Sequence, residues 1–353
     1  MSHQMSVHVI NLPRRILVGY GVLRQLGATC EDLGFNKRVL VVTGDHTIEA
    51  AGREALSSLS SSHIDYDLVI VDEPNAEWVD KIVKTCLDRS PSAIIGVGGG
   101  SIIDVAKLAS AKVGLNFISV PTSASHDGIA SPRASVKGLG VYGSVEARTP
   151  TAIIADVSII KRAPRRLIIS GCGDVIAKIT AVSDWLLAHK LKGEYYGEYA
   201  ASLAKMSAHL VMKSAKEIAS LTDEGIRTLL EALVSCGVAM CIAGSSRPCS
   251  GSEHQFSHAL DIVASRPALH GEQCGVGTIM MAYLHSLDWR RVRQVLRSIG
   301  APTTAEGLGV PSEAIIKALT IAHKIRDRYT ILGETGLTQG AAKRLAKVTG
   351  VIE

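Results

Sequence analysis

Three histidines and one aspartate are spaced along the chain in a way that suits a catalytic metal ion. His254 and His258 are four residues apart, so on a helix their Cβ atoms would lie about 5–6 Å apart on one face. A turn at residues 265–267 would bring His270 back beside that helix, and Asp174 ends the sequence GCGD at the start of another predicted helix. Imidazole nitrogens and a carboxylate, with one position left open, are the ligands of catalytic zinc. The pattern therefore predicts a metal site drawn from these four residues.

Each of these residues also has an ordinary structural interpretation. A single histidine is more often a hydrogen-bonded core or surface residue than a ligand, and an aspartate at a helix start often only stabilises the N-terminus. His258 would be either a second ligand on its helix or a substrate contact beside one ligand. Cys172, Cys249 and Cys274 lie near the three segments in sequence, so a thiolate ligand stays open. The convergence of three histidines with an acid is what favours a metal.

A glycine-rich segment, GVGGGSIID at residues 96–104, follows a short apolar run and precedes a predicted helix. Consecutive glycines let the backbone approach a phosphate, and the helix N-terminus offers free N–H groups and a positive dipole end. Ser101 would add a hydroxyl donor, and Asp104 would either cap the helix or reach a ribose. The segment departs from the usual G-x-G-x-x-G, because Ser101 takes the sixth position and the turn follows the third strand. It indicates a dinucleotide site, with a packing turn as the alternative.

A second polar segment, PTSASHDG at residues 121–128, follows the next predicted strand in the same way. Ligands of open α/β sheets bind at the carboxyl ends of the strands. This segment brings three hydroxyl groups and the carboxylate of Asp127 to that edge. A capped turn is the alternative, but two such turns on successive strands favour a ligand site more than either alone.

The elements that must position these residues divide the chain into two parts. Short apolar strands at residues 38–43, 67–71, 93–97, 116–120 and 151–156 alternate with helical stretches, which is typical of a parallel sheet covered on both faces. Helical periodicity then dominates at residues 170–191, 194–220, 222–243, 252–264 and 271–287, with Ser170 and Thr222 as N-caps and Pro311 in the first turn of a late helix. We predict an α/β domain with a parallel Rossmann-like sheet at residues 1–162. An all-α domain at residues 163–353 would follow, with the active site in the cleft between them.

Composition excludes several classes of function. The chain has 353 residues, a net charge of +5 without a basic run, and only 4% aromatic residues, which argues against nucleic-acid binding. No run of about 18 apolar residues predicts a membrane span, and residues 1–10 do not have the pattern of a signal peptide. The seven cysteines are scattered without a C-x-x-C pair, which indicates free thiols in a reducing cytoplasm. A cytoplasmic enzyme with a small, anionic substrate fits this composition.

Four segments resemble one superfamily of dehydrogenases over nearly the whole chain. They are GGGSIID at 98–104, PTSASHDGIASP at 121–132, GCGDVIAK at 171–178 and GSEHQFSH at 251–258, followed by HGE at 270–272. The superfamily contains glycerol dehydrogenase, iron-dependent alcohol dehydrogenases, dehydroquinate synthase and archaeal glycerol-1-phosphate dehydrogenase. The combination of SHDGIASP with GSEHQFSH is specific, and it is most similar to the last of these groups.

The resemblance implies roles for individual residues. Asp174, His254 and His270 match the ligands of one Zn2+ per subunit, and Asp127, Asp174 and His258 match catalytic substrate contacts. A nicotinamide cofactor, NAD or NADP, would be bound by residues of the two turns: Gly98, Gly99, Gly100, Ser101, Ile102, Asp104, Thr122, Ser123, Ser125 and Ser131. The iron enzymes usually have a histidine where this chain has Lys178, which favours zinc over iron. Dehydroquinate synthase has glutamate in place of Asp174, which counts against the synthase.

The function that the resemblance implies is reversible NAD(P)H-dependent reduction of dihydroxyacetone phosphate to sn-glycerol 1-phosphate, the backbone of archaeal membrane lipids. Zinc would polarise the ketone. The alternatives are a polyol dehydrogenase that acts on unphosphorylated glycerol and a catalytically silent nucleotide-binding protein. Arg133, Lys137 and Lys178 are candidates for a phosphate pocket, although each would serve equally as a solvated surface residue. Asp45 would either bind ribose hydroxyls or cap a helix, so NAD and NADP both stay open. By resemblance we also expect a homo-oligomer.

Overall fold

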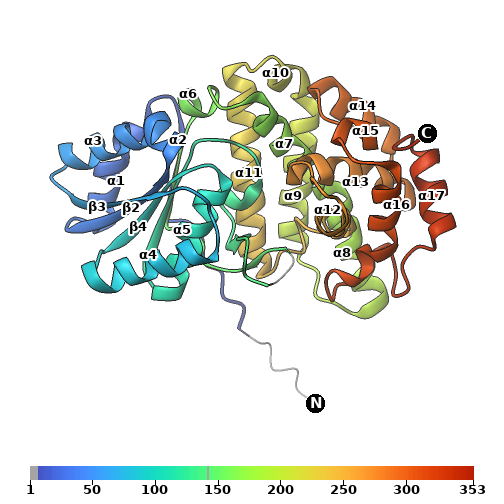
Figure 1. The fold of residues 1–353 in the computed structure, drawn as a ribbon, viewed down its shortest axis with the longest axis horizontal. Coiled ribbons are helices and arrows are strands. Elements are labelled where there is room, and N and C mark those ends of the chain that lie inside the picture. The colour runs from blue at the N-terminus through green and yellow to red at the C-terminus, as the bar shows by residue number, and fades with distance from the viewer. Residues whose placement is uncertain (1–6, 141–142) are drawn as a thin grey trace.

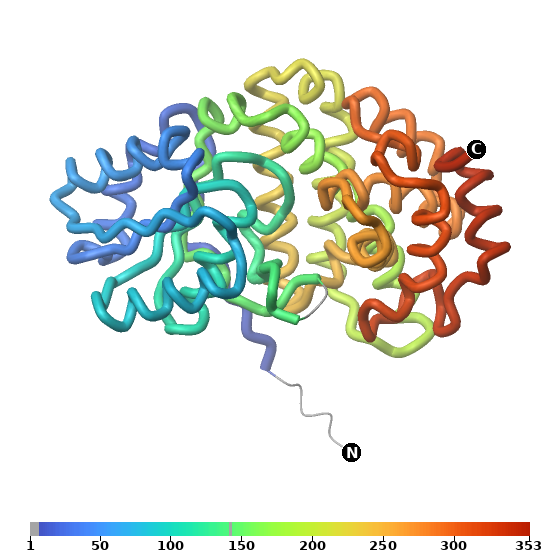
Figure 2. The backbone as a smooth tube through the Cα atoms, in the orientation of Figure 1, coloured from blue at the N-terminus to red at the C-terminus, as the bar shows by residue number. Residues whose placement is uncertain are grey.

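A computed structural model describes residues 7–140 and 143–353 of the chain. The prediction that there is no signal peptide concerns residues 1–10, and residues 1–6 of that segment lie outside the described residues. A sheet with its covering helices forms one side of the molecule, and helices alone form the other (Figure 1). The backbone tube passes from the first side to the second as the residue number rises (Figure 2). The predicted fold class is confirmed.

The sheet has six parallel strands in the order β1-β8-β5-β4-β2-β3. The strands are β1 (Arg15–Gly19), β2 (Arg38–Gly44), β3 (Asp65–Val71), β4 (Ala93–Gly98), β5 (Asn116–Pro121) and β8 (Ala152–Asp156). The five predicted strands are confirmed, whereas β1 was not predicted. β1 is an edge strand with exposed residues at its start, so it does not have the continuous apolar run of a buried parallel strand. A separate hairpin joins β6 (Arg133–Ala134) to β7 (Val145–Glu146).

Alternate residues of the strands point to two different cores, as the period of two requires. Val39 and Val41 face the cluster that contains Leu59 of α3 (Arg53–Ser61). Leu40 and Val42 face the opposite cluster, which contains residues of α4 (Ala76–Arg89) and α5 (Gly100–Val113). The sheet is therefore covered on both faces, and its carboxyl edge stays available for a ligand.

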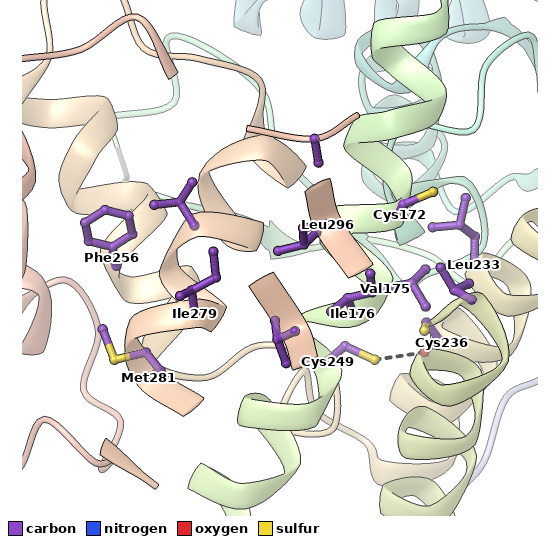
Figure 3. Close-up of a cluster of buried hydrophobic side chains, with 14 of the residues drawn as sticks. Cys172, Val175, Ile176, Leu233, Cys236, Cys249, Phe256, Ile279, Met281 and Leu296 are labelled. Carbon is purple, nitrogen blue, oxygen red and sulfur yellow. Dashed lines mark hydrogen bonds between the residues drawn. The ribbon is translucent and has the colours of Figure 1, made fainter. Parts of the chain in front are cut away.

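The C-terminal half is helical. Its main helices are α7 (Arg165–Ile176), α8 (Lys178–Lys192), α9 (Glu198–Lys213), α11 (Asp223–Ala243), α12 (Ser252–Val263), α13 (His270–Leu284), α14 (Trp289–Ile299), α16 (Ser312–Ile321) and α17 (Gln339–Val348). Their shared core contains Cys172, Val175, Leu233, Phe256 and Ile279 (Figure 3). The predicted domain boundary at residue 162 falls between α6 (Val157–Ile160) and α7, and we keep a division into two domains there as a proposal.

α11 has the length and composition of a membrane-spanning helix, with a mean hydropathy of 1.7 over its most apolar window. However, 67% of that window is buried inside the protein, where the helix packs against α9 and α7. Thr222 caps its N-terminus as predicted, by accepting a hydrogen bond from the backbone N–H of Gly225. These features are those of a core helix.

The predicted start of α7 is wrong. The helix begins at Arg165, directly after Pro164, and it ends at Ile176, so Ser170 lies inside it rather than at its N-cap. Gly171 and Gly173 resemble a helix start in sequence, but neighbouring backbone packs onto both. A Cβ atom on Gly171 would lie 1.9 Å from the carbonyl oxygen of Ala124. A Cβ atom on Gly173 would lie 2.1 Å from the carbonyl oxygen of Gly271, so these glycines are required for close packing.

Gly173→Ala should therefore destabilise the protein by about 2–3 kcal/mol, because a backbone oxygen cannot move aside as a flexible side chain can. Gly340→Ala in α17 is the matched control, since its Cβ atom would meet only the Arg344 side chain, at 3.7 Å. There the better helix propensity of alanine should be neutral or slightly stabilising. Denaturant unfolding measures both variants, and equal stability of the two would contradict the packing argument.

Candidate active site

Four buried or half-buried side chains converge between α7, α12 and α13. They are Asp174, His254, His270 and Cys274, and one potential ligand atom from each lies within 4.8 Å of all the others. A carboxylate, two imidazoles and a thiol within this distance are suitable donors for a tetrahedral divalent metal. The structure thus brings together the three residues that the sequence singles out, and it adds Cys274.

The turn between α12 and α13 produces this arrangement. It reverses the chain so that the His254 and His270 rings have centroids 5.0 Å apart. His258, one helical turn after His254, stacks on His270 with a centroid distance of 5.5 Å and an interplanar angle of 21°. His258 therefore lies beside the four-residue group rather than in it.

Glu253 orients the ring of His254. The carboxylate is fully buried and lies 2.7 Å from His254 Nδ1, and it also accepts hydrogen bonds from Gly251 N–H and the Thr180 hydroxyl. With Nδ1 engaged, His254 Nε2 faces Asp174, at 3.4 Å from Oδ1. Carboxylates that hold the outer nitrogen of a histidine are typical partners of metal-ligating imidazoles. Glu253 was not among the predicted site residues, although the sequence places this acid directly before the candidate ligand His254.

Glu253→Gln should lower zinc affinity about 10- to 100-fold, because the amide orients the imidazole less firmly and no longer supports its basicity. Competition with a chromogenic chelator measures this affinity directly. Glu231→Gln is the control, since Glu231 only forms an exposed pair with Arg227. Equal zinc affinity in both variants would show that Glu253 does not support a metal ligand.

Asp174 does not lie at a helix N-terminus, and that part of the prediction is wrong. It lies in the last turn of α7, where the helix dipole disfavours an anion. Burial also opposes its charge, yet the Lys178 ammonium and His254 hold the pKa of this carboxyl well below its usual range. Its Oδ2 accepts a hydrogen bond of 2.8 Å from the backbone N–H of Asp127. Tertiary contacts therefore replace the helix N-terminus as the source of stabilisation.

Lys178 is fully buried between two carboxylates. Its Nζ lies 2.9 Å from Asp174 Oδ1 and 2.7 Å from Asp127 Oδ2. Burial disfavours the ammonium, but Asp127 and Asp174 raise the pKa of Lys178 well above 10.5. Since both carboxylates already neutralise this charge, Lys178 positions the two acids and is not a free cation for a substrate phosphate.

The two clustered imidazoles differ in protonation. Burial opposes the charge of His254, but the Cys274 sulfur, Asp174 and Glu253 raise its pKa well above the ordinary value. Burial and the neighbouring His254 hold the pKa of His270 well below it. Burial also raises the pKa of the Cys274 thiol. Metal ions displace protons from donor sets of this kind.

The glycine-rich turn lies at the carboxyl edge of the sheet, as predicted. β4 pairs with β5 so that Gly98 lies opposite Pro121, which places the turn at 98–101 beside the segment that follows β5. The buried hydroxyl of Ser123 has no hydrogen-bond partner among the described residues, and a Cβ atom on Gly99 would lie 3.5 Å from it. An unpartnered buried donor facing a glycine turn and the N-terminus of α5 fits a bound phosphate.

A two-residue bridge connects this turn to the metal group. A Cβ atom on Gly100 would lie 2.0 Å from Nε2 of His126, so the imidazole packs directly on the start of α5. The next residue, Asp127, contacts Asp174 through its backbone and Lys178 through its side chain. Two consecutive residues therefore link the glycine-rich turn to the candidate metal donors.

Some of the other residues predicted to bind the cofactor lie at the glycine-rich turn, and others make hydrogen bonds or ion pairs within the protein instead. Ser101 and Ile102 begin α5, and Thr122 and Ser125 follow β5, where the Thr122 N–H bonds the carbonyl of Gly98. In contrast, the Ser131 hydroxyl is engaged locally with the backbone of Arg133. Asp104 is buried, and its carboxylate contacts Lys107 and the backbone N–H of Ser135. That carboxylate holds the hairpin onto α5 instead of extending toward a ribose.

Comparison with known proteins gives close relatives along the whole chain. The chain is 54% identical over 347 residues to glycerol-1-phosphate dehydrogenase (NAD(P)+) of Pyrococcus furiosus, covering 98% of this chain and 100% of that protein. It is 53% identical over 349 residues to the enzyme of the same name from Methanothermobacter thermautotrophicus, covering 99% and 100%. The model of the family described as iron-containing alcohol dehydrogenase matches residues 17–164.

Solved structures share the fold at lower identity. A probable glycerol dehydrogenase from Sinorhizobium meliloti 1021 is similar with a TM-score of 0.78 and 19% identity, covering 97% of this chain and 98% of that one. Glycerol dehydrogenase from Schizosaccharomyces pombe is similar with a TM-score of 0.76 and 18% identity, covering 98% and 94%. These likenesses extend over both the sheet and the helical half.

Proposed function

The chain belongs to the family of glycerol-1-phosphate dehydrogenases, and we propose that it interconverts dihydroxyacetone phosphate and sn-glycerol 1-phosphate with NAD(H) or NADP(H). The observation that carries this proposal is the bridge at residues 126–127. It joins a phosphate-binding turn to a set of metal donors. An enzyme that transfers hydride to a metal-bound ketone needs these two features side by side.

Asp174, His254 and His270 would hold one zinc ion, with Cys274 as an additional donor. A zinc ion bound there would polarise the substrate carbonyl, while the nicotinamide would exchange the hydride. The backbone N–H groups at the start of α5 and the Ser123 hydroxyl bind the dinucleotide phosphates. Lys178 keeps Asp127 and Asp174 in place.

His258 is the residue that we assign to proton transfer at the substrate oxygen. Its ring stacks on His270, and its Nδ1 lies 3.6 Å from Asp261 Oδ2. The other ring nitrogen, Nε2, lies 3.5 Å from Nη2 of Arg326. A histidine held in this way, next to the metal donors, can pass a proton between the alcohol and solvent.

The activity is tested by following oxidation of NADH and NADPH with dihydroxyacetone phosphate and, separately, with dihydroxyacetone. Each assay is made before chelation, after chelation and after zinc is restored. Zinc-dependent turnover of the phosphate ester, with little turnover of dihydroxyacetone, supports the proposal. Preference for dihydroxyacetone would instead identify the protein as a polyol dehydrogenase. Equal activity after complete chelation would show that the reaction does not require a metal ion.

We further propose that the product supplies the glycerophosphate backbone of archaeal membrane lipids, since the stereochemistry of that backbone is that of sn-glycerol 1-phosphate. A homo-oligomer in the cytoplasm is part of the same proposal. Light scattering of the purified protein tests the oligomer, and chiral analysis of the product tests the stereochemistry.

A further inference from the structure

Two arginines from distant parts of the chain meet at Ser144. Arg133, on β6, donates from Nη2 to the Ser144 carbonyl at 2.6 Å. Arg326, in the loop after the 3-10 helix Ala322–Lys324, lies with Nη2 3.3 Å from the Ser144 hydroxyl. The backbone at Gly143 permits this approach, since a Cβ atom there would lie 2.3 Å from Arg326 Nη2. A hairpin of the N-terminal half and a loop of the C-terminal half thus form one cationic cluster.

The charge of this arginine pair is not matched by protein carboxylates. Within residues 7–140 and 143–353, neither guanidinium has a carboxylate oxygen within the 4.0 Å of an ion pair. Glu146 lies opposite Arg133 across the hairpin and raises its pKa without forming an ion pair with it. Burial, and then the neighbouring Arg133, lower the pKa of Arg326 to about 10. Two cations held together and partly desolvated in this way are destabilising unless an anion joins them.

The arginine pair lies one imidazole away from the metal donors. Arg326 Nη2 is 3.5 Å from Nε2 of His258, and His258 in turn stacks on the donor His270. In dihydroxyacetone phosphate only a methylene group and an ester oxygen separate the carbonyl carbon from the phosphorus. A substrate whose carbonyl oxygen lies at the metal donors would therefore bring its phosphate to the guanidinium beside His258.

We propose that Arg326 and Arg133 bind the phosphate group of the substrate and so determine the preference of the enzyme for a phosphorylated over an unphosphorylated ketone. This rests on the proposed function and identifies its phosphate subsite. Planar guanidinium groups suit a phosphate because each donates two parallel hydrogen bonds. Of the other candidates from the sequence, Lys178 is already neutralised by two carboxylates, and Lys137 is an exposed side chain.

The surface outside Arg326 has the same sign of charge. A pocket that Arg326 lines is also lined by Lys192, His323, Lys324 and Arg328, against only Asp327 and Glu334. Lys324 provides a control, because it carries the same charge as Arg326 but is exposed.

The test compares Arg326→Met with Lys324→Met by the ratio of kcat/KM for dihydroxyacetone phosphate to kcat/KM for dihydroxyacetone. In Arg326→Met we expect this ratio to fall about 100-fold, and in Lys324→Met to change less than about threefold. Arg326→Lys should recover part of the ratio, since it restores the charge but not the two parallel hydrogen bonds of a guanidinium group. The preference for NADPH over NADH is measured in parallel, because a change there alone would assign the arginines to the cofactor phosphate and overturn the proposal.

A second measurement is independent of turnover. Inorganic phosphate should raise the thermal unfolding temperature of metal-free wild type and of Lys324→Met, and this shift should disappear in Arg326→Met. If wild type reduces dihydroxyacetone phosphate but Arg326→Met keeps both the substrate ratio and the phosphate shift, the subsite is elsewhere. If wild type does not reduce dihydroxyacetone phosphate at all, the proposed function fails, whatever the phosphate shift shows.

Discussion

His254→Ala should remove bound zinc and lower kcat/KM for dihydroxyacetone phosphate by about 1,000-fold or more. The substitution deletes one of the four donors that converge within 4.8 Å. It also leaves the buried carboxylate of Glu253 without its imidazole partner. The measurements are zinc content after gel filtration and steady-state turnover on the same preparation. Added zinc should not restore activity at concentrations that saturate the wild-type protein.

The control for this variant is His209→Ala, because His209 is an exposed residue of α9. It should keep its zinc and its turnover within about twofold, as surface substitutions usually have small effects. Full activity of His254→Ala without zinc would disprove the metal assignment. Full zinc content with lost activity would instead mean that His254 acts on the substrate and is not needed to bind zinc.

Lys178→Met should destabilise the metal-free protein by about 3–5 kcal/mol, which is the typical cost of removing one partner from a buried ion pair. Methionine keeps the length and the packing of the side chain, so the loss comes from the charge. Asp127 and Asp174 would be left without their shared ammonium in a buried site. Because these acids raise the pKa of Lys178 well above 10.5, the stabilisation is complete at neutral pH. It is lost only as the pH rises through that raised value.

Denaturant unfolding at neutral pH measures this effect, with Lys112→Met as the control. Lys112 also pairs with an aspartate, Asp80, but both side chains are exposed, so its removal should cost no more than about 1 kcal/mol. Equal losses in the two variants would contradict the argument that burial makes the Lys178 pair important.

Much of the fold is predictable from local patterns. β4 and β5 are continuous buried apolar runs, and the β-branched character of such runs distinguishes them from the helices between them. The edge strand β1 was not predicted because it is partly exposed to solvent and therefore lacks a continuous buried apolar run. The start of α7 was predicted wrongly because Gly171 and Gly173 resemble a helix start in sequence. Only the backbone segments packed against them explain glycine within the helix.

Within the site, predictability depends on whether partners lie on one element. The spacing of His254 and His258 follows from helical geometry, and so does the placement of both on one face of α12. Lys178 and Cys274 also stand one turn after candidate residues, Asp174 and His270. Both are candidates from the sequence, Cys274 as a thiolate ligand and Lys178 for a phosphate, but neither spacing shows what the side chain contacts.

The sequence by itself determined the class of fold, the glycine turn at the end of β4 and, through the family resemblance, the choice of Asp174, His254 and His270 as candidate ligands. Only the tertiary structure decided that Lys178 neutralises two acids, that Cys274 joins the donors, and that Arg326 meets Arg133. The reason is physical. Periodicity along one strand or helix is set by backbone geometry and by neighbouring residues. Contacts between elements depend instead on how buried faces pack, and on charges that are stable there only with a partner from a distant part of the chain.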